Sequence, residues 1–429
     1  MDAVLVLGAL FSARYPDLVP AACARSLTVL GIDVSTPGKR RFDDARRAWP
    51  DHPLAGIAEL SWIAGDRHEE ILEQAIRWRD AGHRIRGVLA FGEDYVEAGA
   101  LVADFLDLPS PGLRAARVCR NKLLQRRYLD AWSPASWLLA GDDRRERAAA
   151  WSDFPAVLKP TGREASSGVQ RVDGTAELLT ALEGYDPAEP LLVEQLVDGH
   201  EVSVETLVQH GRVVFASVTG KRTNETGGTY FVEMGHTAPD PALDDGTRSA
   251  VLARNATVLR RLAFRDGIAH AEYRVTPDGR VCLMEIAARA AGDSILTLYH
   301  LATGAPMEEA ALTIALGEPT VYPQPRRYAR QVYLDHAPGV LLDVTAKGLD
   351  TGVTWLADRW MWPPVKPQDT GPATVQMVVA GRPRGDELVE VRQSADRSVM
   401  YVIEAPTPAE LDALERRCTA AVTIDVRGG

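Results

Sequence analysis

Residues 270–286 read HAEYRVTPDGRVCLMEI, and their pattern predicts a β-hairpin. Two apolar runs flank Asp278-Gly279, a preferred two-residue turn of type I′. With that turn, Glu272 lies directly opposite Glu285. A four-residue turn over 276–279 would shift the register by two and make the two glutamates diagonal neighbours. In both registers the two carboxylates share one face of the sheet.

The two carboxylates predict a metal site. Like charges at this separation repel unless a cation lies between them, and hard oxygen ligands on a rigid hairpin suit magnesium carried by a nucleotide. The alternative is that both glutamates project into water from a half-exposed sheet. Leu283, in an apolar run suited to a buried strand, favours the metal site, and so does Arg289, whose cation could serve an anionic substrate beside the metal.

Residues 1–111 predict an open α/β domain, because short apolar runs alternate with amphipathic stretches as in parallel βαβ units. The apolar runs lie at 3–8, 28–34, 57–64 and 85–91, and the amphipathic stretches at 17–27, 68–81 and 95–107. Gly8 ends the first run, but no GxGxxG follows it, and the chain has no GxxxxGK[ST]. The sequence therefore lacks both the dinucleotide fingerprint and the P-loop.

Two proline-rich stretches divide the rest of the chain. Pro109-Ser110-Pro111-Gly112 predicts a linker, and Pro323 and Pro325 mark a second boundary. The elements predicted between them are strands at 155–160, 168–172, 190–197, 201–209, 212–219, 267–275 and 280–287, and helices at 114–131, 244–264, 293–302 and 307–316. A smaller α+β piece with a late helix starting at Pro406 follows, and the aromatic cluster Trp360-Met361-Trp362 receives no role. The predicted fold class is α/β and α+β, with domains at 1–111, 112–318 and 319–429.

Composition excludes several classes of partner. A chain of 429 residues exceeds the size of one core, and its net charge of −11 leaves no basic field for nucleic acid. The four cysteines are scattered without a CxxC pair, which argues against a disulfide framework or a structural zinc and predicts a reducing cytoplasm. The apolar run at the start of the chain is much shorter than the roughly 20 residues that span a bilayer, so no membrane partner is predicted.

With the upstream lysines added to the hairpin, the chain resembles the ATP-grasp superfamily, in which a nucleotide lies between two α+β lobes. The resemblance covers roughly residues 1–318 and rests on the order of its motifs. These are Arg120-Asn121-Lys122, Val157-Leu158-Lys159-Pro160, Ser166-Ser167-Gly168-Val169, Leu192-Val193-Glu194-Gln195-Leu196-Val197, Gly199-His200-Glu201 and the hairpin. Each motif alone is commonplace, whereas the ordered set would rarely arise by accident.

The resemblance implies how ATP binds. The lysines, one of them on the first helix of the module, would neutralise phosphate oxygens, and the serine-glycine loop would close over the phosphates with its N–H groups. A hinge carboxylate would accept the adenine amino group, backbone atoms would read the ring edge, and the last glutamate would hold the ribose. The residues implied are Lys122, Lys159, Ser166, Ser167, Gly168, Glu194, Gln195, Leu196, Val197 and Glu201, with Glu272 and Glu285 on magnesium and manganese as an alternative ion.

Residues 227–239, GGTYFVEMGHTAP, resemble the Phe-x-Glu-x-Gly-His segment of ATP-grasp L-amino acid ligases. This implies that Glu233 meets a substrate ammonium and that His236 lines the same pocket; the alternative for His236 is a loop histidine bonded to backbone. Gly227-Gly228 predicts a mobile lid. Arg289, near Gly292, resembles the arginine that binds the reacting carboxylate and acyl phosphate, and with Lys159 and the loop it is predicted to be catalytic.

The function implied is that of an ATP-dependent ligase joining the carboxylate and amine of small molecules, amino acids in the first instance, through an acyl phosphate with release of ADP and phosphate. One departure is Ala287, where many relatives carry an asparagine, so a ligand of a second magnesium is missing. The alternatives are a carboxylase, a ligase of a carrier thiol or of another amine, and an ATP-binding regulator without turnover. A homodimer is left open.

Overall fold

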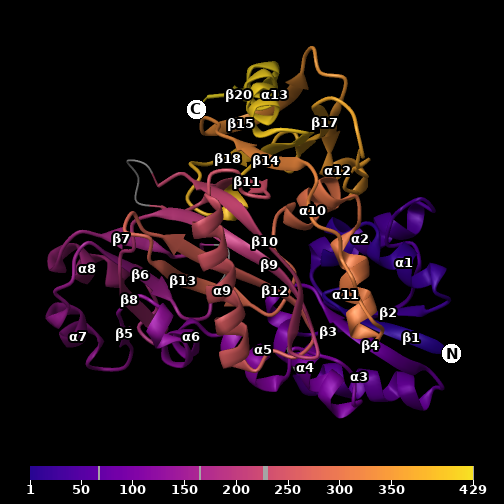
Figure 1. Ribbon diagram of the computed structural model, residues 1–429, viewed down its shortest axis with the longest axis horizontal. Helices are drawn as coiled ribbons and strands as arrows, with labels where there is room; N and C mark the ends of the chain where they lie inside the picture. Colours follow the sequence, from indigo (N-terminus) through magenta and orange to yellow (C-terminus); the bar gives the residue numbers. More distant parts are fainter. Residues whose placement is uncertain (66–67, 164–165, 226–229, 429) are drawn as a thin grey trace.

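The computed structural model describes residues 1–65, 68–163, 166–225 and 230–428, and the strands of these residues form four β-sheets (Figure 1). The predicted lid at Gly227-Gly228 lies outside the described residues. Within the described part of the chain, no helix is both long enough and apolar enough to cross a membrane.

The N-terminal sheet is parallel, with the strand order β3-β2-β1-β4. Its elements are β1 (Asp2–Leu7), α1 (Leu18–Ala24), β2 (Thr28–Val34), α2 (Pro37–Ala48), β3 (Ile57–Ile63), α3 (His68–Asp80), β4 (Arg84–Ala90) and α4 (Val96–Phe105). All four predicted strands are confirmed. Helix α2 was not predicted, because it is rich in arginine and short of apolar residues, but Thr36 caps it and Pro37 fits its first turn.

A four-stranded antiparallel sheet, β5-β8-β6-β7, forms the first lobe, and α5 and α6 lead into it. The elements are α5 (Leu113–Cys119), α6 (Lys122–Tyr128), β5 (Ser136–Leu139), α7 (Arg144–Ala150), β6 (Ala156–Pro160), β7 (Gln170–Val172), α8 (Thr175–Ala181) and β8 (Leu191–Gln195). The single helix predicted over 114–131 is wrong: Asn121 has extended φ and ψ and its side chain accepts from Leu124 N at 3.0 Å, so it caps a second helix. Lys122 is consequently the first residue of α6.

The largest sheet has nine strands in the order β13-β12-β9-β10-β11-β14-β19-β17-β16. Its strands are β9 (His200–Gln209), β10 (Arg212–Thr223), β11 (Glu233–Ala238), β12 (Gly267–Val275), β13 (Val281–Ala287), β14 (Tyr328–Leu334), β16 (Val353–Trp355), β17 (Thr374–Ala380) and β19 (Val399–Ala405). This sheet continues across the boundary predicted at residue 318, and the three-domain division stays a prediction. Glu233 and His236 belong to β11, a strand that was not predicted and that pairs with both β10 and β14.

The 270–286 hairpin has neither of the two predicted turns. Thr276 N donates to Arg280 O at 3.0 Å, which leaves residues 277–279 as a three-residue loop whose last residue, a glycine, has a φ of 82°. The register then shifts by one residue after Glu272, and this irregularity places Glu272 directly opposite Glu285. The predicted pairing of the glutamates is therefore confirmed, although the turn that was expected to produce it is wrong.

The remaining elements complete the C-terminal part. They are α9 (Asp245–Leu262), α10 (Ile295–Thr303), α11 (Met307–Ala315), α12 (Leu356–Arg359), α13 (Pro408–Ala421) and the sheet β18-β15-β20, made of β15 (Gly339–Ala346), β18 (Glu387–Leu388) and β20 (Val422–Arg427). The late helix begins at Pro408 rather than Pro406, because the Thr407 side chain accepts from Glu410 N and caps it.

One apolar core joins three parts of the chain. It includes Tyr15 from the N-terminal domain, Leu298 from α10 and Val402 from β19, all at most 2% exposed. In Figure 1, α11 lies against the N-terminal domain, where it contacts β4, and α10 lies beside the C-terminal part, where it contacts β14. Because these parts share a core, each of them can contribute side chains to the same cleft.

Candidate active site

A cleft of about 440 Å³ is lined by residues of the first lobe with its antiparallel sheet β5-β8-β6-β7, of the nine-stranded sheet, of the N-terminal domain and of the segment 394–397. The predicted site residues that line it are Lys122, Lys159, Ser166, Ser167, Glu194, Gln195, Leu196, Val197, Glu201, Glu233, His236, Glu272, Glu285, Arg289 and Gly292. Gly168 belongs to the serine-glycine loop but does not line the cleft. A glycine is favoured there because its φ is 70° and because the Cβ of any other residue would lie only 3.0 Å from Arg163 Nη1.

A buried ion triad lies at the hinge. Arg126 of α6 donates to both oxygens of Glu194, at 2.6 and 3.2 Å, and Lys159 Nζ lies 2.7 Å from the same carboxylate. Burial and the Arg126 charge lower the pKa of Lys159 to about 8, against the opposing effect of Glu194. Glu194, predicted to accept from adenine, thus already accepts three donors in this state. Arg126 was missed because one arginine among many carries no local signal.

The backbone of the hinge is also partly engaged. Gln195 N donates to Ala135 O at 3.0 Å and Leu196 N donates to Pro155 O at 3.2 Å. These two N–H groups hold the strands of the first lobe together, so they are already used in this state. The ring-edge contact predicted for 195–197 would therefore involve other backbone atoms.

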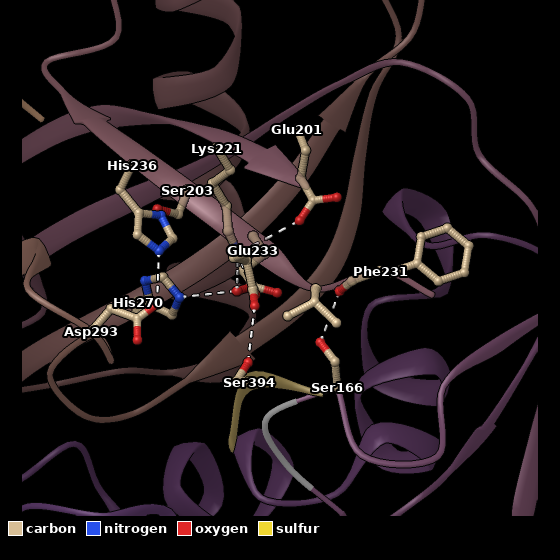
Figure 2. Close-up of polar contacts among 12 residues, drawn as sticks. Ser166, Glu201, Ser203, Lys221, Phe231, Glu233, His236, His270, Asp293 and Ser394 are labelled. Atoms are coloured by element: carbon tan, nitrogen blue, oxygen red, sulfur yellow. Dashed lines mark hydrogen bonds and ion pairs between the residues drawn. The ribbon is translucent and has the colours of Figure 1, made fainter. Parts of the chain in front are cut away.

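Lys221 of β10 lies at the centre of a cluster of carboxylates. Its Nζ lies 2.5 Å from Glu272, 3.1 Å from Glu233 and 3.6 Å from Glu201, and its side chain is 1% exposed (Figure 2). Although burial opposes the charge, Glu272 and the other carboxylates raise the pKa of Lys221 well above its ordinary value. No role was predicted for Lys221, although a lysine in a chain with only six lysines was a usable signal.

The facing glutamates are each held by a lysine. Glu285 accepts from Lys122 Nζ at 2.9 Å, while Lys221 and His270 contact Glu272. Burial opposes the Glu272 charge, but Lys221 and His270 hold its pKa well below its usual range. The described residues contain no group of three histidine, cysteine or acidic side chains that could hold a metal ion. A metal here would therefore take two protein carboxylates and its remaining oxygens from a nucleotide and water, as magnesium commonly does.

His270 occupies the place across the hairpin from Ala287, the position of the missing asparagine. Its ring nitrogens contact Glu205 at 2.9 Å and Glu272 at 3.2 Å. Burial alone would lower the pKa of His270, but Glu205 and Glu272 raise it to about 9. An imidazolium therefore lies in this part of the cleft wall.

Glu201, predicted to hold the ribose, lies next to Arg274. Arg274 donates to Glu201 at 2.7 Å and to Val197 O at 3.0 Å, and it also contacts Glu225. Its guanidinium lies 5.6 Å from the ring centre of Phe231. The Phe231 carbonyl accepts from Ser166 Oγ at 3.0 Å, so the serine loop of one lobe contacts the segment before β11 of the other (Figure 2).

Next to this cluster, His236 and Glu233 of β11 contact side chains from distant parts of the sequence. His236 Nε2 lies 2.9 Å from Asp293, which corrects the alternative of a histidine bonded to backbone. Arg397 donates to both oxygens of Asp293, at 2.9 and 2.7 Å, and Tyr333 also donates to it. Although burial opposes the charge, Arg397 and His236 hold the pKa of Asp293 well below its usual range.

This arrangement fixes the chemistry of two predicted residues. Asp293 occupies His236 Nε2, and the other ring nitrogen, Nδ1, is buried and has no partner among the described residues. The Glu233 carboxylate accepts a hydrogen bond from Ser394 Oγ at 3.3 Å, and the Glu233 backbone carbonyl accepts one from Arg397 at 2.7 Å. Neither Asp293 nor Arg397 was predicted, since they meet only through the tertiary fold.

Arg289 is anchored to the N-terminal domain. Its Nε contacts the carboxylate of Glu93, and its Nη1 donates to Ala290 O at 2.8 Å. Glu93 begins a short 3-10 helix (Glu93–Tyr95) after β4 and is 6% exposed. The carboxyl edge of the parallel sheet therefore positions the arginine that was predicted to bind the reacting acid.

Comparison with known proteins places this geometry in a family. Residues 152–298 match the family model described as ATP-grasp domain. The chain is 24% identical over 210 residues to the ATP-grasp enzyme fsqD of Aspergillus fumigatus, covering 46% of the chain and 36% of that protein. It is 25% identical over 204 residues to D-alanine–D-alanine ligase of Aquifex aeolicus, covering 46% of the chain and 67% of that protein. The first of these relatives is thus matched over little more than a third of its length.

Among solved structures, L-amino acid ligase from Bacillus licheniformis has the same fold over the whole chain. The TM-score is 0.75 at 19% identity, with 100% of the chain and 99% of that protein covered. The family match over residues 152–298 and this shared fold confirm the predicted resemblance to ATP-grasp proteins and the predicted fold class.

Proposed function

We propose that the protein is an ATP-dependent ligase that joins the carboxylate of one small molecule, in the first instance an amino acid, to the amine of another. One observation carries the proposal: a single cleft holds a facing pair of glutamates with three lysines, and next to them Arg289 and the Glu233–His236 pair. The first group suits a metal-bound triphosphate. The second suits an acid and an ammonium.

Lys122, Lys159 and Lys221 are the cations that would meet the phosphates. In this state each is neutralised by a glutamate, at 2.9, 2.7 and 2.5 Å. Glu272 and Glu285 would hold magnesium, which supplies charge neutralisation at the phosphate oxygens when it is bound. With magnesium on those two glutamates, Lys122 and Lys221 would be available to bind phosphate oxygens.

The reaction would run in two displacements. An acid oxygen attacks the γ-phosphorus of ATP, the bond to ADP breaks, and an acyl phosphate forms, while Arg289 holds the acid and the lysines stabilise the charge that spreads over the phosphoryl oxygens. An amine then attacks the acyl carbon and phosphate leaves. Glu233 would orient the amine, and the proton that the amine loses would leave with the phosphate.

Nucleotide and phosphate release test this proposal. The full-length protein is incubated with magnesium, ATP and pairs of amino acids, with bicarbonate, simple amines and a carrier thiol as further arms, and the products are identified by mass. Amide products with equal amounts of ADP and phosphate support the ligase. ADP released with bicarbonate alone would indicate a carboxylase, and tight ATP binding without ADP release in any arm would indicate a regulator.

A further inference from the structure

One cation on the cleft wall is not neutralised by the protein. The other lysine, arginine and histidine side chains that the structure describes there each have a carboxylate oxygen within 2.9 Å. No carboxylate among the described residues contacts Arg14, and its guanidinium donates no hydrogen bond to them. Among the cations described on the cleft wall, Arg14 is therefore the one whose charge is not balanced by a described carboxylate.

Arg14 is held in place by aromatic rings rather than by acids. It ends a 3-10 helix (Phe11–Arg14) that follows β1, and it is half-buried. Its guanidinium carbon lies 4.7 Å from the ring centre of Phe11 and 5.8 Å from that of Trp362. Both rings lie within cation–π distance of the guanidinium, and such contacts use none of its N–H groups, which stay available for hydrogen bonds.

The position of Arg14 points to the substrate end of the cleft. The nucleotide lysines come from α6 and from strands of the two lobes, whereas Arg14 comes from the N-terminal domain and packs on the C-terminal Trp362. Burial and Asp293 raise the pKa of Tyr333, and Arg397 and Arg14 partly offset that rise, so the charge of Arg14 acts close to the Tyr333 hydroxyl. That hydroxyl donates to Asp293 beside His236.

We propose that Arg14 binds an anionic group, a carboxylate or a phosphate, on the side chain of one of the substrates. The inference rests on the proposed function, since it takes the ligand to be the acid or the amine that the ligase joins. The N–H edge of an arginine pairs with both groups through two parallel hydrogen bonds. Such a site favours aspartate, glutamate or O-phosphoserine over their uncharged counterparts, because an uncharged side chain leaves the guanidinium unpaired in the cleft.

The test compares charged and neutral substrates in three forms of the full-length protein: wild type, Arg14→Gln and Arg40→Gln. Arg40 is a matched control, because its guanidinium carbon also lies over a ring, 4.1 Å from the centre of Trp62, yet it does not line the cleft. Aspartate, glutamate and O-phosphoserine are assayed beside asparagine, glutamine and serine, each paired with alanine in magnesium-ATP. Thermal denaturation of all three proteins reports any loss of fold.

In wild type the anionic side chains are expected to be the better substrates. In Arg14→Gln their KM is expected to rise about 10- to 100-fold, while the KM values of the neutral amino acids and the Tm stay the same. The anionic substrate whose KM rises most, a carboxylate or O-phosphoserine, identifies the anionic group that Arg14 binds. Equal KM changes for charged and neutral substrates, or a Tm loss with unchanged KM values, would overturn the inference and leave Arg14 a packing residue.

A binding measurement separates this inference from the proposed function. Calorimetry with aspartate or O-phosphoserine, in the presence of magnesium and a non-hydrolysable ATP analogue, needs no turnover. Binding that is lost in Arg14→Gln and kept in Arg40→Gln supports the anion site even if no pair of amino acids is ligated. Ligation of neutral amino acids without any effect of Arg14→Gln would leave the ligase standing and remove the anion site.

Discussion

Arg126 and Glu194 form a two-point ion pair at the hinge of the cleft, with N–O distances of 2.6 and 3.2 Å and side chains only 1% and 4% exposed. Removing Arg126 takes away both of these hydrogen bonds and leaves Lys159 as the cation beside Glu194. Arg126→Met is therefore expected to lower the free energy of unfolding by about 1–3 kcal/mol, measured by urea denaturation. Arg127→Met, on the exposed neighbour, is the control and is expected to change it by less than about 0.5 kcal/mol.

The double variant Arg126→Met/Glu194→Gln distinguishes the pair from simple packing. If the two side chains stabilise the fold through their contact, the double variant loses less free energy of unfolding than the sum of the two single variants. A double variant as unstable as the sum of the two single variants would contradict this explanation.

How far the sequence determined the site depends on how local each signal was. The facing glutamates were predictable because both lie on one hairpin, and the motifs around Lys122 and Lys159 were predictable from their order along the chain. The turn was not, since Pro277 and Gly279 fit a three-residue loop as well as they fit the two predicted turns. The predicted turn was therefore wrong, whereas the predicted pairing of Glu272 with Glu285 was confirmed.

The residues that were missed share a different property. Arg126, Glu93, Asp293 and Arg397 each act through a partner 68 to 196 positions away in the sequence. No periodicity or motif links such positions, and in an arginine-rich chain one buried arginine looks like any exposed one. These contacts depend on the shared core of the N-terminal, middle and C-terminal parts, which only the fold specifies.

Lys221 is expected to be needed for turnover. Three carboxylates lie within 3.6 Å of its ammonium, and it is a candidate phosphate ligand. Lys221→Met is expected to lower kcat for ADP release about 100- to 1,000-fold, the effect of removing one charge from the transition state. Magnesium is expected to raise the Tm of this variant more than that of wild type, because it would replace the missing cation beside Glu272.

The control for that experiment is Lys347→Met, which removes an exposed lysine of the C-terminal part. Lys221→Arg keeps the charge and is expected to retain the fold with part of the activity. Near-wild-type turnover in Lys221→Met would remove Lys221 from the phosphate site.

ATP binding is expected to weaken as the pH rises through about 8. Burial and Arg126 lower the pKa of Lys159 to about 8, so the free protein loses this ammonium at higher pH. A triphosphate prefers the charged form and raises the pKa of the lysine in the complex, so binding takes up a proton above pH 8 and not below pH 7. Calorimetry at pH 8.5 in two buffers of different ionisation enthalpy measures this uptake, and Lys159→Arg, which stays charged, is expected to abolish it.

Arg289→Ala is expected to abolish ligation, with kcat/KM for the acid falling at least about 100-fold. The same change leaves the buried Glu93 without its arginine and destabilises the fold, so activity alone is ambiguous. The double variant Arg289→Ala/Glu93→Gln separates the two effects, since it is expected to recover the Tm without recovering ligation. A double variant that regains both would show that Arg289 acts through the fold and not on the acid.

Glu308→Gln is expected to stabilise the protein at neutral and alkaline pH. Glu308 is 3% exposed, lines a small apolar cavity beside Arg289, and its Oε2 has no partner among the described residues. Burial raises its pKa to about 7, so the folded state binds a proton that the unfolded state releases, and stability falls as the pH rises from about 4.5 to about 7. The glutamine removes this penalty, a gain on the order of 1–3 kcal/mol at pH 8 that disappears below about pH 4.5. Glu309→Gln is the control, because it removes the same charge from the same first turn of α11. If both variants changed the pH dependence of stability equally, the effect could not be assigned to the burial of Glu308.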